Sequence, residues 1–293
     1  AWWRVLRDGR GRAAPSLRDI IFMDLDKNMI VLQKCSHNNV DFEVLAYDKL
    51  RGAQSVNMAQ SMFFAEQTGL KVKQVKITLN NSSIKTEAGA LYYSKGKIES
   101  KTKSGGATGL FKKAVSGALT NESAIKPTYT GSGEIYLEPS FKHYLVLELD
   151  NDSIIVDKGL FFCCSAEIDI KVMAQKNVSS ALLGGEGVFQ IQLIGTGVVI
   201  LELDVPESEI VSYELTNGEE LKVDGNFAIA RTSGVSFSVT KSDKSLLGSA
   251  INGEGFLNAF KGEGTVWLAP TAPMYKRLYT GISFGNSSIN NQE

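Results

Sequence analysis

Apolar and polar residues alternate along much of the chain, with the period of two that is typical of half-buried β-strands. The alternation runs through Val72–Leu79, Ala166–Val172 and Val235–Val239. Two further stretches, Tyr144–Leu149 and Val198–Leu203, are mainly apolar runs of strand length. Many short strands of this kind predict an all-β fold, either a sandwich or a barrel.

Clusters of small polar residues interrupt these strands and predict turns. They lie at Asn80–Ser83, Asp150–Ser153 and Thr216–Glu219. The Asn217-Gly218 pair in the last cluster is a good signal for a two-residue β-hairpin, because both residues tolerate a positive φ.

A short phrase with two glycines occurs three times, at Gly131-Ser-Gly133, Gly195-Thr-Gly197 and Gly262-Glu-Gly264. The first glycines are 64 and 67 residues apart, and each phrase runs into an apolar strand. A near-constant step indicates one structural unit used three times. We interpret the phrase as a glycine turn or bulge that leads into a core strand, where a positive φ costs glycine nothing.

An acidic residue precedes each of these phrases, at Glu87, Asp157 and Asp224, and a glycine follows each acid closely. A catalytic carboxylate would not need three copies. The recurrence therefore favours a structural role, such as accepting hydrogen bonds from the N–H groups of a turn.

The repeats suggest a division of the chain. The predicted parts are a foreign or mis-assigned leader over 1–22, an N-terminal extension of unclear structure over 23–60, repeat units over 61–140, 141–204 and 205–271, and a polar C-terminal tail over 272–293. Residues 61–271 form one compact domain in this interpretation. The leader is set apart because it holds five of the eight arginines and no lysine, so we exclude it from the fold. A basic arm for nucleic acid or a transit peptide is the alternative.

One or two short helices are expected. In Gly109–Leu119, Leu110 and Phe111 fall on an apolar face, and Lys112 and Lys113 fall on a polar one. This pattern resembles an interfacial helix, so these four residues are the candidate membrane or partner contact. The alternative is a short helix that covers an open end of the β-structure. Phe63–Glu66 belongs either to a second helix or to the strand that leads into the first unit.

Composition excludes several classes of protein. The formal net charge of −1 gives no global field to attract nucleic acid or acidic membranes. Three cysteines without regular spacing argue against a disulfide framework and suggest a reducing compartment. No apolar run approaches the ~18 residues of a membrane span. We therefore expect a cytoplasmic protein, with at most peripheral contact with a membrane.

Candidate chemistry is sparse. The glycine phrases lack the third glycine of a dinucleotide fingerprint, and none opens a helix. The only histidines, His37 and His143, are more than a hundred residues apart, so no local metal cluster can be built. A Ser-His-Asp arrangement with His143 has no nucleophile elbow to support it. We predict no catalytic residue, no cofactor and no metal.

Two further groups have a functional interpretation and a structural one. Strand alternation would place one sulfur of Cys163-Cys164 in the core and the other outward. A buried free cysteine is the structural interpretation, and a vicinal redox pair is the functional one. The carboxylate pairs Glu167/Asp169 and Glu202/Asp204 are expected on solvated strand faces.

Three blocks carry a family resemblance: Thr86–Ile98, Leu182–Phe189 and Ser249–Pro270. In combination they resemble the AIM24 family of mitochondrial-biogenesis proteins and bacterial homologues, over about residues 61–271. The resemblance implies a TRAP-like double-stranded β-helix, triplicated within the chain, and it brings no catalytic residues. The eukaryotic members are tied to the mitochondrial inner membrane. The RNA contacts and the tryptophan pocket of the TRAP attenuator have no counterparts here.

Three functions remain open. The first is a non-enzymatic scaffold or interaction protein, at membranes or in homo-oligomers, because repetition leaves strand edges that need partners. The second is a module that binds a small ligand or nucleic acid, although the near-zero charge counts against nucleic acid. The third is an uncharacterised hydrolase, which has the least support.

Overall fold

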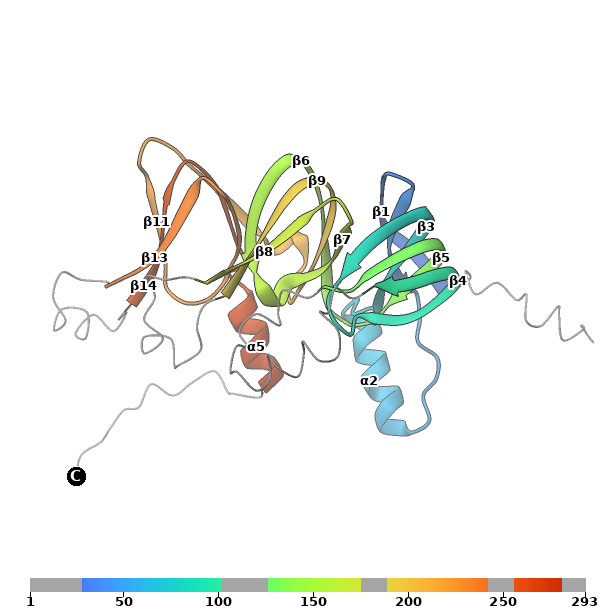
Figure 1. Ribbon diagram of the computed structural model, residues 1–293. Coiled ribbons are helices and arrows are strands. Elements are labelled where there is room, and N and C mark those ends of the chain that lie inside the picture. Colours follow the sequence, from blue (N-terminus) through green and yellow to red (C-terminus); the bar gives the residue numbers. More distant parts are fainter. Residues whose placement is uncertain (1–27, 102–125, 175–188, 242–255, 281–293) are drawn as a thin grey trace, which may run out of the picture.

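The computed structural model describes residues 28–101, 126–174, 189–241 and 256–280, which form the row of β-structure and the two α-helices in Figure 1. In chain order the strands are β1 (Met29–His37), β2 (Val40–Tyr47), β3 (Lys73–Thr86), β4 (Leu91–Lys101), β5 (Thr128–Leu137), β6 (His143–Asp157), β7 (Phe161–Ser165), β8 (Asp169–Ala174), β9 (Phe189–Leu203), β10 (Val211–Leu215), β11 (Glu220–Val223), β12 (Ala228–Thr232), β13 (Val235–Lys241), β14 (Phe256–Gly262) and β15 (Gly264–Leu268). The helices are α2 (Val56–Gln67) and α5 (Ala272–Thr280), with short 3-10 turns η3 (Lys158–Leu160) and η5 (Glu207–Glu209). The predicted all-β class is confirmed.

Most strands belong to one sheet of twelve. Its main path is β1-β2-β3-β7-β9-β6-β12-β15-β10, and β5, β4 and β8 are attached beside it. A second sheet holds β11-β14-β13. All pairings are antiparallel. Figure 1 shows three groups in a row, with β1–β5 at one end, β6–β9 in the middle and β11, β13 and β14 at the other end.

The strands expected at Val72–Leu79, Tyr144–Leu149, Val198–Leu203 and Val235–Val239 are present, but two predicted turns are not turns. Asn80–Ser83 and Asp150–Ser153 lie inside the continuous strands β3 and β6, where the pairing register shifts. Asn81 and Asn151 adopt φ values of 50° and 54° there. A single asparagine with positive φ makes a bulge that bends a strand without ending it, which explains the error.

The Asn217-Gly218 turn forms, but the hairpin prediction is wrong. The N–H of Glu219 donates to the carbonyl of Thr216 at 3.0 Å, which closes the turn. The flanking strands do not pair with each other, because β10 pairs with β15 and β11 pairs with β14. The Asn-Gly sequence predicts the turn, but it does not determine which strand each flanking strand pairs with.

The three glycine phrases lie in the long inner strands, within β5 and β9 and at the junction of β14 with β15. All six glycines have φ between 126° and 149°. A Cβ on Gly131 would stand 1.9 Å from the carbonyl oxygen of Lys97 on the neighbouring strand. The first two phrases do lie in core strands, but the interpretation of them as turns or bulges is wrong, because the extra residues of each bulge belong to the opposite strands, β3 and β6.

The core consists of three clusters of apolar side chains. Cys163 belongs to the first cluster, around Ile77 and Ile135, and Cys164 belongs to the second, around Leu193 and Leu201. Both cysteines are fully buried and free. The expectation that one sulfur points outward is wrong, because β7 lies between two cores and has no solvent face.

The flanks also carry structure. Residues 28–47 extend the sheet, since β2 pairs with the first half of β3, and α5 occupies the start of the predicted polar tail. The division into repeat units stays a prediction. The proposed contact residues Leu110, Phe111, Lys112 and Lys113 lie outside the described residues, as do the leader 1–22 and most of the block 182–189.

Candidate functional site

Helix α2 is held by its own ends more than by the β body. Its N-cap Ser55 accepts a hydrogen bond from the N–H of Met58 at 3.2 Å, and the hydroxyl of Thr68 donates to the carbonyl of Phe64 at 2.9 Å. Beyond it Gly69 adopts φ 70°, and the N–H of Leu70 donates to the carbonyl of Ala65 at 2.8 Å. These caps satisfy backbone groups at both ends of the helix.

The helix has no buried side chain, although it is rich in apolar residues. Val56 is 83% exposed, and Phe63 and Phe64 are each 57% exposed. The two phenyl rings meet edge to face with centroids 5.7 Å apart. A surface helix normally buries its apolar stripe. Exposed apolar side chains gathered on one element indicate a contact surface.

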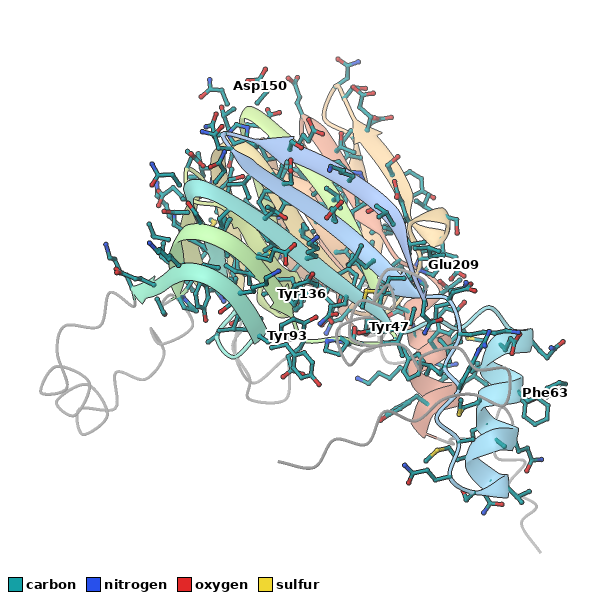
Figure 2. The ribbon with its side chains drawn as sticks, turned by 90° about the vertical axis from the view of Figure 1, so that its right-hand side faces the viewer. Tyr47, Phe63, Tyr93, Tyr136, Asp150 and Glu209 are labelled. Carbon is teal, nitrogen blue, oxygen red and sulfur yellow. The ribbon has the colours of Figure 1, made fainter. Side chains whose placement is uncertain are left out.

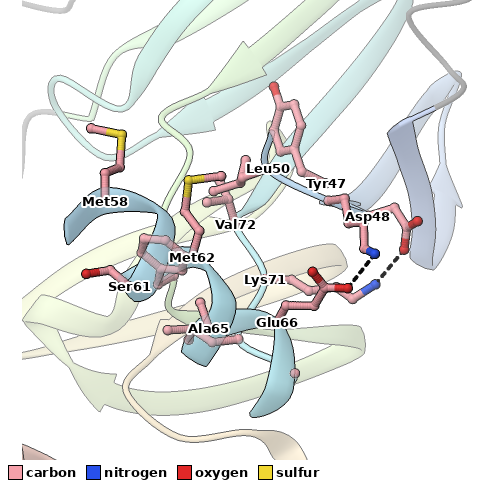
Figure 3. A pocket seen from close by; sticks show the side chains of 14 residues that line it. Tyr47, Asp48, Leu50, Met58, Ser61, Met62, Ala65, Glu66, Lys71 and Val72 are labelled. Atoms are coloured by element: carbon pink, nitrogen blue, oxygen red, sulfur yellow. Dashed lines mark hydrogen bonds and ion pairs between the residues drawn. The ribbon is translucent and has the colours of Figure 1, made fainter. Parts of the chain in front are cut away.

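A pocket of about 450 Å³ lies between α2, the end of β2 and the start of β3. Figure 3 shows Met58, Met62 and Ala65 of the helix along one wall and Leu50 and Val72 opposite them. Phe141, which follows β5, also lines it. Pockets of this size with mainly apolar linings suit small ligands, and methionine side chains adapt to irregular ones.

Two ion pairs stand at the rim of the pocket. Lys71 Nζ lies 2.8 Å from Asp48 Oδ1, and Lys49 Nζ lies 2.5 Å from Glu66 Oε1 (Figure 3). The hydrogen bond from Lys71 and its positive charge lower the pKa of Asp48. The second pair ties the last turn of α2 to the segment after β2, so it fixes the width of the opening.

A cluster of tyrosines adjoins the pocket through Tyr47, which lines it. The rings of Tyr93 and Tyr136 stack with centroids 4.4 Å apart, and Tyr92 lies beside Tyr93 (Figure 2). Burial first, and then the neighbouring Tyr136, raise the pKa of Tyr93 to about 12. The raised pKa keeps the phenol of Tyr93 protonated at neutral pH, so it offers a polar hydroxyl and an apolar face without charge.

Helix α5 lies on the same side of the β body as α2 in both Figure 1 and Figure 2. It too exposes apolar and aromatic side chains, with Leu278 62% and Tyr279 93% exposed. The hydroxyls of Thr271 and Tyr275 donate to Glu209 of η5, the latter at 2.7 Å, and so anchor the helix. We call the exposed apolar residues of the two helices that do not line the pocket the helix face; they are Val56, Phe63, Phe64, Met274, Tyr275, Leu278 and Tyr279.

The candidate chemical residues are scattered. Within the described ranges, no group of three His, Cys, Asp or Glu side chains is placed to hold a metal. His143 opens β6, and its pKa is lowered by burial first and by the charge of Lys73 second, while Glu209 raises it. Burial raises the pKa of Cys163 well above its ordinary value and that of Cys164 to about 12. Neither thiol has the thiolate character that a redox pair needs.

One of the two predicted carboxylate pairs forms ion pairs with a lysine, and the other does not lie on a single strand face. Glu202 and Asp204 both face Lys142, at 3.2 and 3.7 Å. Glu167 lies in the turn before β8 rather than on the strand, so its predicted pairing with Asp169 on one strand face is wrong. Ala166 and Glu167 alternate like a strand, but the chain must turn there to pass from β7 to β8.

The recurring acids do accept turn N–H groups where such bonds are described. Asp157 Oδ1 accepts from the N–H of Gly159 at 3.0 Å, and Glu87 Oε1 accepts from the N–H of Ala88 at 3.1 Å. Glu87 also pairs with Lys126. The structural interpretation of these two carboxylates is therefore confirmed.

Sequence reasoning missed the helix face as a site. The available signals were Ser55, a good N-cap residue, and the run Met58–Phe64 after it. Within this segment the pattern of Phe63–Glu66 allows either a helix or a strand, and the helix is present. No helix within the described ranges is long and apolar enough to cross a bilayer.

Comparisons with known proteins bear on the fold and the family. One protein-family model, described as "AIM24: Mitochondrial biogenesis AIM24", matches residues 64–271. The crystal structure of protein SPYM3_0169 from Streptococcus pyogenes aligns with 71% of this chain and 94% of that one, at 21% identity and a TM-score of 0.53. At that identity the likeness concerns the fold alone. No curated protein sequence matches the chain.

Proposed function

Because the chain belongs to the AIM24 family, we propose that it works as a non-enzymatic interaction scaffold that binds the surface of a membrane through the helix face. The observation that carries this proposal is that α2, with Phe63 and Phe64, buries no side chain of its own. A cytoplasmic protein that touches the bilayer peripherally fits this role.

The surroundings of the helix face support contact with lipid headgroups. Arg51 lies in the segment before α2, and Lys276 and Arg277 lie on α5. Lys49 and Lys71 also lie beside α2, where they pair with Glu66 and Asp48. Interfacial helices place aromatic and aliphatic side chains in the acyl boundary and lysine or arginine at the headgroups. Because the net charge of the whole chain is −1, attraction to anionic lipid would have to come from local groups of basic residues such as these.

Vesicle co-sedimentation tests the proposal. Vesicles of phosphatidylcholine with phosphatidylglycerol should bring down the full chain, and replacing both Phe63 and Phe64 with Ser should reduce binding by about a hundredfold, because two buried aromatic side chains contribute about 3 kcal/mol at a membrane. The matched control is Val211→Ser with Tyr213→Ser, which also removes two exposed apolar side chains, but from β10. Failure of the unchanged protein to sediment, or equal loss in both variants, refutes the proposal.

The pocket favours a second candidate function, the binding of a small apolar ligand. Its volume of about 450 Å³ and its Met58–Met62 wall support that role. Native mass spectrometry of protein purified from its source would show a bound molecule, and Met62→Trp, which fills the pocket, should abolish it. A bare mass in the unchanged protein would count against this second function and leave the first untouched.

A further inference from the structure

Helix α2 presents apolar side chains on two sides. Met58, Met62 and Ala65 recur at the three- and four-residue spacing that places side chains on one side of a helix, and all three line the pocket (Figure 3). Val56 and Phe63 fall on the other side and belong to the helix face. A membrane that contacts Phe63 cannot also cover the stripe of Met58, Met62 and Ala65, so this stripe needs an occupant of its own.

The space between this stripe and the β body is not filled by the described part of the chain. Its volume is about 450 Å³, whereas packed protein interiors contain few voids larger than a water molecule. Four large apolar side chains that line it are each between 45% and 47% exposed; they are Leu50, Met58, Leu70 and Phe141. Apolar walls that face one another across an open space favour an apolar occupant over water.

The charges of the pocket are gathered at one end. Of the described residues that line it, Asp48, Lys49, Glu66 and Lys71 are charged, and Figure 3 shows them together, away from Met58. The other lining side chains are apolar or carry only a hydroxyl. An occupant that fits this division has one long apolar part and one charged end.

The charged end of the pocket has a surplus of positive charge. Lys49, Lys71 and the neighbouring Arg51 stand there against two acids, Asp48 and Glu66. The hydrogen bond from Lys71 lowers the pKa of Asp48 most, and the charges of Lys49 and Arg51 lower it further, so all three cations act at this end. Both ion pairs are partly exposed, and such pairs contribute little to stability. A lysine can therefore exchange its carboxylate partner for an anionic group of a ligand.

We propose that the pocket beneath α2 binds a single unbranched acyl chain with an anionic head, in which Met58 and Met62 contact the acyl chain and Lys49 and Lys71 bind the head. The flexible methionine side chains can follow the bends of such a chain. Lysine binds carboxylate and phosphate alike as a point charge, so the head is either of these two groups. This inference rests on the second candidate function, apolar-ligand binding in this pocket, and it does not require that the helix face bind a membrane.

Calorimetric titration with saturated fatty acids, below their micelle concentrations and without vesicles, tests the acyl chain. From hexanoate to decanoate each added methylene should tighten binding by about fourfold, and the gain should stop once the acyl chain fills the pocket. Met62→Trp, which occupies the pocket, should weaken decanoate binding by about tenfold or more. The matched control is Met274→Trp, which places the same side chain at an exposed methionine of α5, and unfolding curves show that both variants fold.

Exchange of charge tests the head. Lys49→Gln with Lys71→Gln should weaken the binding of decanoate by about tenfold and leave the binding of decanol unchanged. The matched control, Lys142→Gln with Lys171→Gln, also removes two lysines of exposed ion pairs, but away from the pocket. The unchanged protein should bind decanoate more tightly than decylammonium.

The outcomes separate the ligand class from the pocket itself. Affinity that is independent of acyl-chain length, or equal loss in Met62→Trp and Met274→Trp, overturns the proposal and the second candidate function together. Decanol or decylammonium bound as tightly as decanoate overturns the anionic head, and leaves apolar-ligand binding in the pocket intact.

The same chemistry has two sources, a free fatty acid and one acyl chain of an anionic phospholipid. Native mass spectrometry distinguishes them after the protein is incubated with phosphatidylglycerol vesicles that contain hexadecanoate and is then separated from them by gel filtration at high salt. The added mass of one fatty acid or of one phospholipid supports the proposal and identifies the source. A protein that carries neither overturns it.

Discussion

At the scale of single residues, the two-glycine phrases act through shape. Their φ values are accessible to glycine and strained for other residues. The neighbouring strand also lies so close that a Cβ on Gly131 would clash with it. Other glycines in the chain lie in open space, such as Gly52, where a Cβ would have no atom within 4 Å.

We expect Gly131→Ala to lower the free energy of unfolding by about 3 kcal/mol or more, because it adds backbone strain and a clash with the carbonyl of Lys97. Chemical denaturation measures the change. Gly52→Ala is the control, and it should stay within about 0.5 kcal/mol of the unchanged protein. Equal effects at the two positions would contradict this account of the phrase.

The buried thiol of Cys164 makes stability depend on pH in the alkaline range. Burial raises its pKa from 9.0 to about 12. A group whose pKa is higher in the folded state gives its full stabilisation below the unfolded value and loses it as pH rises toward the folded value. The free energy of unfolding should therefore fall between pH 9 and 12, and denaturation curves at several pH values measure it.

Cys164→Ala is the comparison for that experiment. The variant lacks the thiol, so its stability should fall less steeply above about pH 9, although it is less stable at about pH 7 because it leaves a small cavity. Parallel curves for the two proteins would mean that other groups, such as Tyr93 with its pKa of about 12, account for the whole slope.

Alternation predicted the direction of side chains well and their surroundings poorly. Cys163 and Cys164 do point to opposite faces of β7, as the period of two requires. The pattern does not show that apolar side chains cover both faces of β7, because many of the residues in the two clusters come from strands far away in the sequence.

At the scale of elements, α2 depends on its caps. Ser55→Ala removes the acceptor of the Met58 N–H, and a lost N-cap costs about 1 kcal/mol of helix stability. Hydrogen exchange of the first turn of α2 should speed up by about fivefold, while amides in β3 and β9 keep their rates. Slower folding or faster exchange in the β body would show that α2 supports the sheet after all.

The sequence predicted elements where the cause is local. Most strands with alternating residues were placed correctly, and so was the tight turn at Asn217-Gly218. The exception is Ala166–Val172, whose first residues form the turn before β8. Bulges were mistaken for turns, because asparagine with positive φ serves in both, and the choice depends on whether a neighbouring strand continues to pair. At Asn81 and Asn151 the neighbour supplies a hydroxyl, since Ser132 and Thr196 accept the asparagine N–H, each at 2.9 Å.

At the scale of the whole molecule, Arg231 ties two groups of strands together. Its side chain is buried, and its guanidinium donates to the carbonyl of Val235 and to Gln190 Oε1 of β9, the latter at 3.0 Å. Burial lowers its pKa to about 10, so it stays charged at neutral pH. This single side chain therefore links β9 to β12 and β13 through hydrogen bonds.

Arg231→Ala should therefore lower the free energy of unfolding by about 3 kcal/mol, because it removes buried packing and leaves the acceptors of two hydrogen bonds unpaired. Hydrogen exchange should show the loss first in β12 and β13. Arg51→Ala, at an exposed position, is the control and should have little effect. If exchange sped up equally in all strands, the idea that Arg231 stabilises β12 and β13 locally would be wrong.

The fold class and the family could be predicted from the sequence, because recurring phrases, turn residues and apolar runs are local patterns that can be recognised in it. The arrangement of the strands in a row could not, since it depends on which half of β3 or β6 receives a later strand. The candidate site was missed for a related reason. The site is defined by the exposure of Phe63 and Phe64, which no described part of the chain covers. A sequence pattern predicts an apolar helix face but not whether another element packs against it.

The pairings β3–β7 and β6–β12 share one register counted from the recurring acids: Thr86, before Glu87, faces Cys163, six residues after Asp157, and Val156, before Asp157, faces Ala230, six residues after Asp224. This shared register has a consequence for how such a chain can evolve. If the predicted repeat units are copies of one segment, a duplication that inserts one more segment of 64 to 67 residues supplies both strands of a further pairing of this kind at once, because each segment carries an acid, a receiving strand before it and a matching strand after it. Lengthening or shortening the protein by whole segments then demands no new contact surface. Selection can change the ends and the helices freely while the inherited connection stays the same.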